Sequence, residues 1–228
     1  MTDLQIDRAA ATAGTRSGEN APPSGRRDWQ RVSLFLGGIM FAVGNMLHPL
    51  EHKDAAYETA TWEAAHLTIF FSLPLLVLGL PYLQRRLAAH TDSRLAGFAV
   101  AASMAGLIGI GPGTIIETFV APMIGHHAMT ELESGGMGLV NAILGVAYLG
   151  GTIALGWVVR RCKLRPRGAG TSLIVSAVVL LGMMTATGPA AGVVVIVSTM
   201  IYGIALSALA VPRLADPKLA DPKLADEA

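Results

Sequence analysis

The sequence predicts an all-α polytopic membrane protein with six transmembrane helices in a bundle and both termini in the cytoplasm. Of the 228 residues, 52% are hydrophobic and only 14% are charged, whereas soluble domains carry about 25% charged residues. The apolar residues fall into six stretches, most of them near the roughly 20 residues that a helix needs to cross a bilayer core. The basic residues gather on one side of such a bundle, as cytoplasmic loops do.

The six predicted spans follow one another along the chain. They cover residues 32–47, 64–83, 95–120, 138–159, 171–187 and 190–211. The first is predicted to end before Pro49, because proline disfavours the helical conformation of the preceding residue. The third contains GIGPG at residues 109–113, which predicts a break or a kink. The last two share a stretch without charge and separate at TGPA, residues 187–190, a sequence typical of turns.

Both ends of the chain are polar and are predicted to be disordered cytoplasmic tails, which leaves a transmembrane domain at residues 31–212. Residues 1–30 combine Pro, Gly, Ser and scattered charges without any apolar stretch. Residues 213–228 repeat the unit LADPK and are too polar to pack. Segments of this kind cannot bury enough apolar surface to offset the entropy that ordering costs.

The positive charges predict the orientation. With six spans, all but one of the 17 Lys and Arg residues lie on one side, and the exception is Lys53. This bias, with an Ala-, Gly- and Arg-rich composition, predicts a bacterial plasma (inner) membrane protein whose basic loops contact anionic inner-leaflet lipids. The run RRCKLRPR at residues 160–167 is interpreted as part of this signal, and nucleic-acid binding is not predicted. Its cations favour the thiolate form of Cys162, although we interpret this cysteine as incidental.

Histidine gathers on the opposite, extracytoplasmic side. Five of the six histidines fall there, and only His90 falls inside. The positive-inside rule explains why Lys and Arg avoid the outer loops, but it does not explain an enrichment of His. Imidazole together with carboxylate suits Zn, Cu, Fe or Mn. The candidate metal ligands are His48, Glu51, His52, His66, Glu117, His126 and His127.

Local spacing allows these groups to converge in an outward-facing polar pocket. If Pro49 starts a new helix, Glu51 and His52 lie in its first turn. If the first helix instead continues through a kink, both residues share a face with His48. Glu117 lies roughly 33 Å along a helix that starts at residue 95, which places it near the outer interface. A broken third span is tolerated at membrane depth where it lines such a cavity.

Four interpretations of these polar residues remain open. The leading one is a metal- or cofactor-binding pocket that serves redox or hydrolytic chemistry. The second is haem held by His66 together with His126 or His127. The third is a small-solute or ion carrier that uses Glu117 and the histidines. The fourth is a set of solvated helix ends, in which His66 and Glu117 pair locally.

The sequence leaves open whether the protein is an enzyme. It contains no phosphate-binding lysine loop, no G-x-S-x-G nucleophile motif and no cysteine pair. None of these catalytic motifs therefore indicates a reaction. A further alternative is a non-catalytic membrane subunit of a larger complex, with a membrane protein partner or a second copy of the chain beside it. Small residues spaced four apart, such as Ala147 and Gly151, favour close helix packing.

Overall fold

The structure is a computed structural model that describes residues 24–51 and 53–211, and every regular element among them is helical. The predicted C-terminal tail, most of the predicted N-terminal tail and His52 lie outside the described residues. In chain order the elements are α1 (Ser24–Leu47), α2 (Asp54–Tyr57), α3 (Ala60–Ala88), α4 (Ser93–Ile115), the π-helix η1 (Ile116–Val120), α5 (Ala121–Ser134), α6 (Gly136–Arg161), α7 (Ala169–Leu181), the 3-10 helix η2 (Gly182–Met184) and α8 (Pro189–Ala210).

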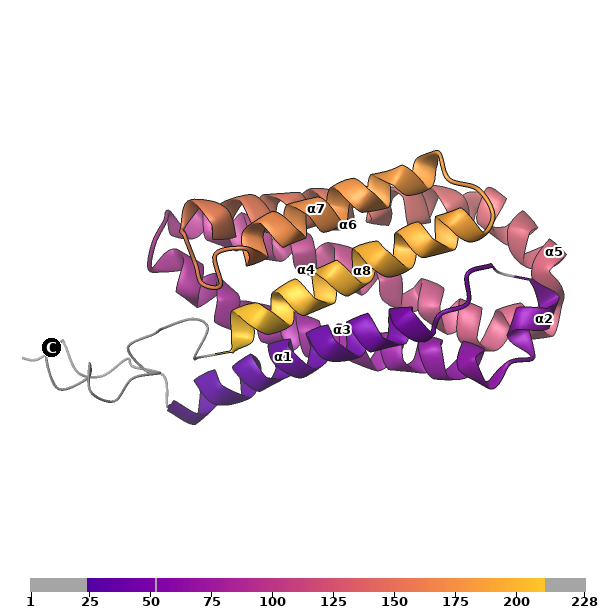
Figure 1. Cartoon of the computed structure of the whole chain (residues 1–228), viewed down its shortest axis with the longest axis horizontal. Helices are drawn as coiled ribbons and strands as arrows, with labels where there is room; N and C mark the ends of the chain where they lie inside the picture. Colours follow the sequence, from indigo (N-terminus) through magenta and orange to yellow (C-terminus); the bar gives the residue numbers. More distant parts are fainter. Residues whose placement is uncertain (1–23, 52, 212–228) are drawn as a thin grey trace, which may run out of the picture.

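Six of these helices form a closed ring around a common axis (Figure 1). Going around the ring, α1 packs against α3, α3 against α4, α4 against α6, α6 against α7, α7 against α8, and α8 returns to α1. The short helix α2 and the helix α5 contact each other at one end of the bundle. Residues on the inner faces of all six ring helices can therefore meet on the axis.

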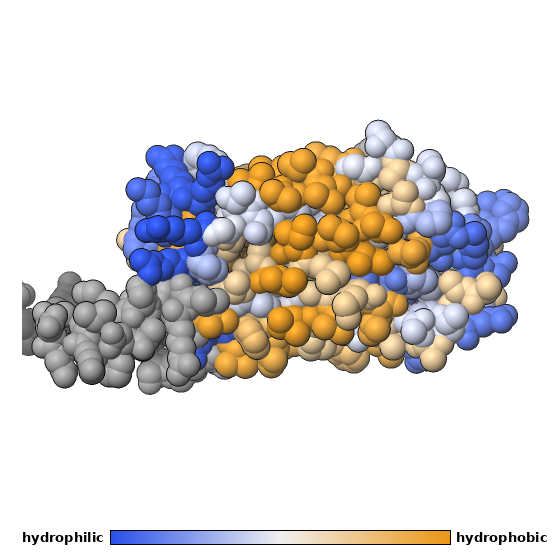
Figure 2. Space-filling model, viewed as in Figure 1, coloured by the Kyte–Doolittle hydropathy of each residue, from blue (hydrophilic) through white to orange (hydrophobic). Residues whose placement is uncertain are grey.

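A broad band of apolar side chains covers the middle of the molecule, and polar side chains gather at its two ends (Figure 2). Phe71, Phe98, Ile108, Val146 and Ile204 are each more than half exposed within this fold. So much exposed apolar surface is rare in water-soluble monomers. Five described helical stretches are long and apolar enough to cross a membrane, namely Trp29–Leu47, Ala60–Ala88, Arg94–Ser134, Gly136–Arg161 and Pro189–Ala210. The fold thus fits a multi-pass membrane protein.

The helices coincide with the predicted spans, but the fifth predicted span is short. Helix α7 has 13 residues, which corresponds to about 20 Å and falls below the roughly 30 Å of a bilayer core. The 3-10 turn Gly182–Met184 continues it. Five crossings are therefore compatible with the structure, and the sixth stays a prediction. Other boundaries differ modestly, since α1 begins at Ser24 and α3 ends at Ala88.

The ring collects the helix termini at two ends (Figure 1). One end, here named the basic end, holds the starts of α4 and α7 and the ends of α3, α6 and α8. It carries Arg85 and Arg86 in the last turn of α3 and Arg160 and Arg161 in the last turn of α6. The other end, named the histidine end, holds the end of α1 together with α2, η1 and α5. Which end faces the cytoplasm stays a prediction.

The closest approach between α1 and α8 depends on two glycines. A Cβ atom added to Gly203 would lie 2.4 Å from the carbonyl oxygen of Gly38, and one added to Gly38 would lie 2.5 Å from the carbonyl oxygen of Gly203. Small residues let membrane helices pack backbone to backbone. The predicted small-residue contact on α6 is also present, since a Cβ on Gly151 would lie 2.6 Å from the carbonyl carbon of Ala102 on α4.

Three buried aromatic rings, from α1, α6 and α8, pack against one another. The ring centroid of Tyr202 lies 5.7 Å from that of Phe41 and 5.3 Å from that of Tyr148. None of the three side chains is more than 4% exposed. We refer to Phe41, Tyr148 and Tyr202 as the aromatic floor, because Phe41 and Tyr148 also line the cavity that opens toward the histidine end.

At Pro112 and Pro49 the structure excludes an alternative that the sequence leaves open. Helix α4 does not break at residues 109–113 but continues through Pro112 to Ile115. The irregularity follows directly as the π-helix η1, in which the Ala121 N–H donates to the carbonyl of Ile116. Proline removes one backbone donor and crowds the preceding turn, and both prolines and π turns are sites where helices deviate from regular geometry. Pro49 starts no helix, since the next one begins at Asp54.

Candidate metal centre

His66 lies in the second turn of α3 and is almost completely buried, with 1% of its surface exposed. Its Nδ1 atom is 2.7 Å from the carbonyl oxygen of Trp62, one turn earlier in the same helix. A carbonyl can only accept a hydrogen bond, so Nδ1 carries the proton and donates. This contact fixes the tautomer and directs Nε2 away from the helix. The indole ring of Trp62 packs on the imidazole, with ring centroids 4.1 Å apart.

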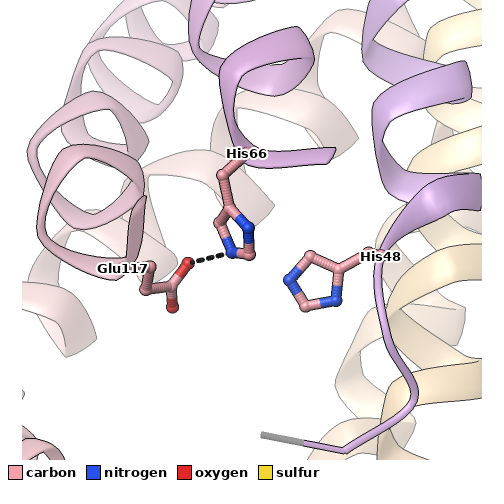
Figure 3. A group of neighbouring side chains, drawn as sticks. All are labelled: His48, His66 and Glu117. Carbon is pink, nitrogen blue, oxygen red and sulfur yellow. Dashed lines mark ion pairs between the residues drawn. The ribbon is translucent and has the colours of Figure 1, made fainter. Parts of the chain in front are cut away.

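His48 follows the last residue of α1 and is half-buried. Its Nδ1 lies 2.9 Å from the carbonyl oxygen of Pro49, so this nitrogen is also a donor to a backbone carbonyl. The ring centroids of His48 and His66 are 4.8 Å apart. In Figure 3 the other ring nitrogen of His48, Nε2, points toward His66. Both imidazoles thus use Nδ1 for the backbone and turn Nε2 inward.

Glu117 comes from the π-helix η1, and its side chain is 28% exposed. Its Oε2 atom lies 3.2 Å from Nε2 of His66 (Figure 3). Its backbone carbonyl accepts a 3.0 Å hydrogen bond from the indole Nε1 of Trp62. Trp62 therefore holds two of these residues at once, His66 through its carbonyl and Glu117 through its indole N–H.

The three side chains converge on one point. One ligand atom from each of His48, His66 and Glu117 lies within 4.8 Å of the other two. In a tetrahedral site with bonds of about 2.1 Å, neighbouring ligand atoms are roughly 3.4 Å apart. The 3.2 Å separation between His66 and Glu117 already matches such an edge.

The contact between His66 and Glu117 is not an ordinary hydrogen bond. Nε2 of His66 is buried and has no aligned hydrogen-bond partner among the described residues, although Oε2 of Glu117 is close. If His66 is neutral, with its one ring proton on Nδ1, the lone pair of Nε2 faces a carboxylate oxygen. Two electron-rich atoms in contact repel unless a positive charge lies between them, and burial strengthens that repulsion.

A cavity of about 690 Å³ adjoins this group and occupies the axis of the ring of helices. All six ring helices or their ends contribute to its wall, together with η1 and α5. Its apolar lining includes Ile69, Ile110, Leu144, Leu180 and Val195. His48, His66 and Glu117 lie on the same wall, so a bound ion would face the cavity.

The other sequence candidates lie elsewhere at the histidine end. Glu51 lines the cavity and pairs with Lys53. His126 is exposed, and its backbone N–H donates a 2.8 Å hydrogen bond to Oδ1 of Asp54. His127 is 92% exposed, with Nε2 3.6 Å from Oε1 of Glu131. His52 lies outside the described residues. None of these belongs to the converging group found among the described residues.

Trp62 is the site residue that sequence reasoning missed. Its position at the start of a span suggests an interfacial anchor, but the side chain is only 1% exposed. The available signal is its spacing from His66, because residues four apart in a helix share a face. Nothing in the sequence indicates its second contact, with Glu117, which lies 55 residues away.

The fold and the site together define a class, a multi-pass membrane-type helical bundle with a His-His-Glu group that could hold a metal ion. No protein-family model, curated protein or solved structure matches this chain. The geometry of the site is therefore the basis for a functional conclusion.

Proposed function

We propose that this protein is a multi-pass membrane protein that binds one divalent transition-metal ion through His48, His66 and Glu117. The observation that carries the proposal is the shared arrangement of the two imidazoles. Each donates Nδ1–H to a backbone carbonyl and turns Nε2 toward the common point. Metal-binding histidines are held in this way, because the outer hydrogen bond fixes the tautomer and orients the ring.

The proposal also accounts for the contact between His66 and Glu117. A metal ion between Nε2 and the carboxylate would convert a repulsion into two bonds to a cation. An imidazolium–carboxylate pair is the competing explanation, and it would require Nε2–H to point at Oε2. The absence of hydrogen-bond alignment at a separation of 3.2 Å supports the metal ion instead.

The ligand set favours Zn²⁺ or Fe²⁺. Two histidines and one carboxylate with an open coordination position occur in hydrolytic zinc sites and in non-haem iron sites. Calcium and magnesium prefer ligand sets made of oxygen. An open position next to a cavity supports a role in binding or converting a small molecule rather than a purely structural one.

We place the metal centre on the extracytoplasmic face of the plasma (inner) membrane. The basis is the positive-inside rule, because the described Arg clusters lie at the basic end and the metal centre lies at the opposite end. The carrier alternative would need a route past the aromatic floor, whose three side chains are at most 4% exposed. This floor supports a binding or catalytic role over transport.

The test is a titration of the purified protein with Co²⁺ as a spectroscopic probe, followed by elemental analysis after exposure to Zn²⁺ or to Fe²⁺ without oxygen. We expect wild type to bind a single equivalent. The His48→Ala and His66→Ala variants should lose more than the roughly 10–100-fold in affinity that outer-shell changes cost. The His127→Ala variant serves as the matched control, because His127 is 92% exposed and does not line the cavity, and it should bind like wild type. Full metal binding by both His48→Ala and His66→Ala would overturn the proposal.

A further inference from the structure

We infer that the cavity beside the metal centre binds an amphiphile with a hydrocarbon tail and one anionic, metal-coordinating head, of the class of medium-chain carboxylates. This inference rests on the proposed metal centre and adds the chemical class of its ligand. It follows from the depth of the cavity, the chemistry of its wall and the charge of the site.

The cavity is deep along the axis of the bundle. On α1 its wall runs from His48 back to Phe41, a distance of roughly 10 Å at 1.5 Å per residue. On α8 it runs from Ala191 to Thr199, which is a similar length. Phe41 and Tyr148 of the aromatic floor are the deepest lining residues on α1 and α6. The cavity volume of about 690 Å³ falls within the roughly 300–1,000 Å³ of small-molecule sites.

The wall is mostly apolar below the level of the metal centre, and its polar residues Asn45, Thr114 and Thr199 donate hydrogen bonds to backbone carbonyls of their own helices. Ile69 lies one turn deeper than His66 on α3, and Ile110 lies two turns deeper than Glu117 on α4. Leu144, on α6, and Val195, on α8, face the same space. Burial of hydrocarbon in such a space is favourable by about 0.8 kcal/mol for each methylene. A tail directed from the metal centre toward Phe41 would therefore be stabilised along its length.

The charge of the site selects the head. A divalent ion with two neutral imidazoles and the Glu117 carboxylate retains a single positive charge. Of the other titratable residues of the wall, Glu51 and Lys53 pair with each other, and His126 is exposed. An uncompensated charge beside an apolar cavity is costly, so a monoanionic head neutralises the site. Three protein ligands also leave a coordination position for its oxygen.

Two glycines provide a direct way to fill the cavity. Gly113 on α4 and Gly145 on α6 both line it, and a Cβ atom added at either position would meet nothing within 4 Å. A leucine at these positions would project into the space that the tail needs. Gly150, on the same helix as Gly145, offers a matched control, because it is exposed, does not line the cavity and also has open space at Cβ.

The experiment uses the full-length protein in phosphatidylcholine nanodiscs, loaded with Co²⁺ and titrated with octanoate, acetate and octanol while the visible spectrum is recorded. Each buried methylene is worth roughly a factor of four in affinity. If three to four of its six additional methylenes are buried, octanoate should perturb the Co²⁺ spectrum at a concentration roughly 100-fold lower than acetate does. Octanol lacks the anionic head and should leave the spectrum unchanged.

The variants distinguish binding of octanoate in the cavity from its partitioning into the bilayer. Gly145→Leu and Gly113→Leu should still bind Co²⁺ and respond to acetate, but should lose the preference for octanoate. Gly150→Leu should behave like wild type. If wild type binds no Co²⁺, both the metal centre and this inference fail. If Co²⁺ binds but octanoate acts no better than acetate, or octanol acts equally well, the metal centre stands and the inference is overturned. If one leucine variant no longer binds Co²⁺, the octanoate preference of the other leucine variant tests the inference.

Discussion

The indole N–H of Trp62 donates a 3.0 Å hydrogen bond to the backbone carbonyl of Glu117, which joins the first turn of α3 to the π-helix η1. The carbonyl of the same tryptophan accepts the hydrogen bond from Nδ1 of His66. One buried side chain therefore sets the relative position of an imidazole and a carboxylate that come from different helices. This arrangement makes Trp62 a positioning residue for the metal centre.

Replacing Trp62 by Phe should weaken metal binding without removing a ligand. The variant keeps an aromatic ring against His66 but loses the hydrogen bond to Glu117, and the loss of an outer-shell contact costs about 10–100-fold in metal affinity. Co²⁺ titration measures the change. Trp157→Phe is the control, because Trp157 is 47% exposed and lies in the half of α6 near the basic end. Equal affinities for wild type and the Trp62 variant would contradict this role.

Metal should stabilise wild type and should not stabilise the Glu117→Gln variant. An ion that binds only the folded state raises stability by about 2.7 kcal/mol at a concentration 100 times its dissociation constant. Glutamine keeps the shape of glutamate but removes its charge, so most of this gain should disappear. Thermal unfolding with and without Zn²⁺ checks the prediction, with Glu131→Gln as a control, since its side chain is 71% exposed. A full Zn²⁺ response in Glu117→Gln would count against a metal–carboxylate bond.

The crossing of α1 and α8 should not tolerate a side chain at Gly203. A Cβ there would lie 2.4 Å from the carbonyl oxygen of Gly38, and backbone cannot yield as a flexible side chain does. Overpacking typically costs about 1–3 kcal/mol, and we expect Gly203→Val to lie at the upper end. Unfolding in a detergent–denaturant series measures this, with Gly150→Val as the open-space control. If the two variants were equally stable, α1 and α8 would not pack as described.

Cysteines placed at the two ends of the bundle should be labelled from opposite sides of the membrane. His127 lies at the histidine end and His90 at the basic end, and both are exposed. In a Cys162→Ser background, a membrane-impermeant maleimide added to intact cells should label His127→Cys and spare His90→Cys. After permeabilisation, both should react. The reverse pattern would invert the proposed orientation and place the metal centre on the cytoplasmic side.

Cys162 should react slowly with alkylating reagents near neutral pH. The sequence predicts a thiolate favoured by nearby cations, but burial raises the pKa of the thiol more than Arg161 lowers it. A raised pKa means that the protonated, unreactive form persists to higher pH. Iodoacetamide should therefore modify the folded protein at pH 8 more slowly than the protein unfolded in detergent, and the two rates should converge as pH rises above the folded pKa. A faster reaction in the folded state would contradict this.

The sequence alone determines the helical architecture, because each helix follows from residues within its own segment. Long apolar runs, the end of α1 before Pro49 and the basic clusters near residues 85 and 160 need no knowledge of packing. The same local reasoning allowed a break at residues 109–113, where α4 is continuous, and did not predict the π-helix η1 that follows. Pro112 is accommodated within α4, and the π turn begins at Ile116, directly after the end of that helix.

Only the tertiary structure decided which polar residues meet. The sequence predicts seven candidate metal ligands at one end of the bundle. Their spacing along the chain does not decide which of them meet. Closure of the six-helix ring brings the end of α1 beside the start of α3, and the π turn carries Glu117 to the same point. His127 remains in solvent because α5 lies outside the ring. The pattern of residues along one helix sets which side chains share a face, whereas contacts between helices depend on packing that no single segment encodes.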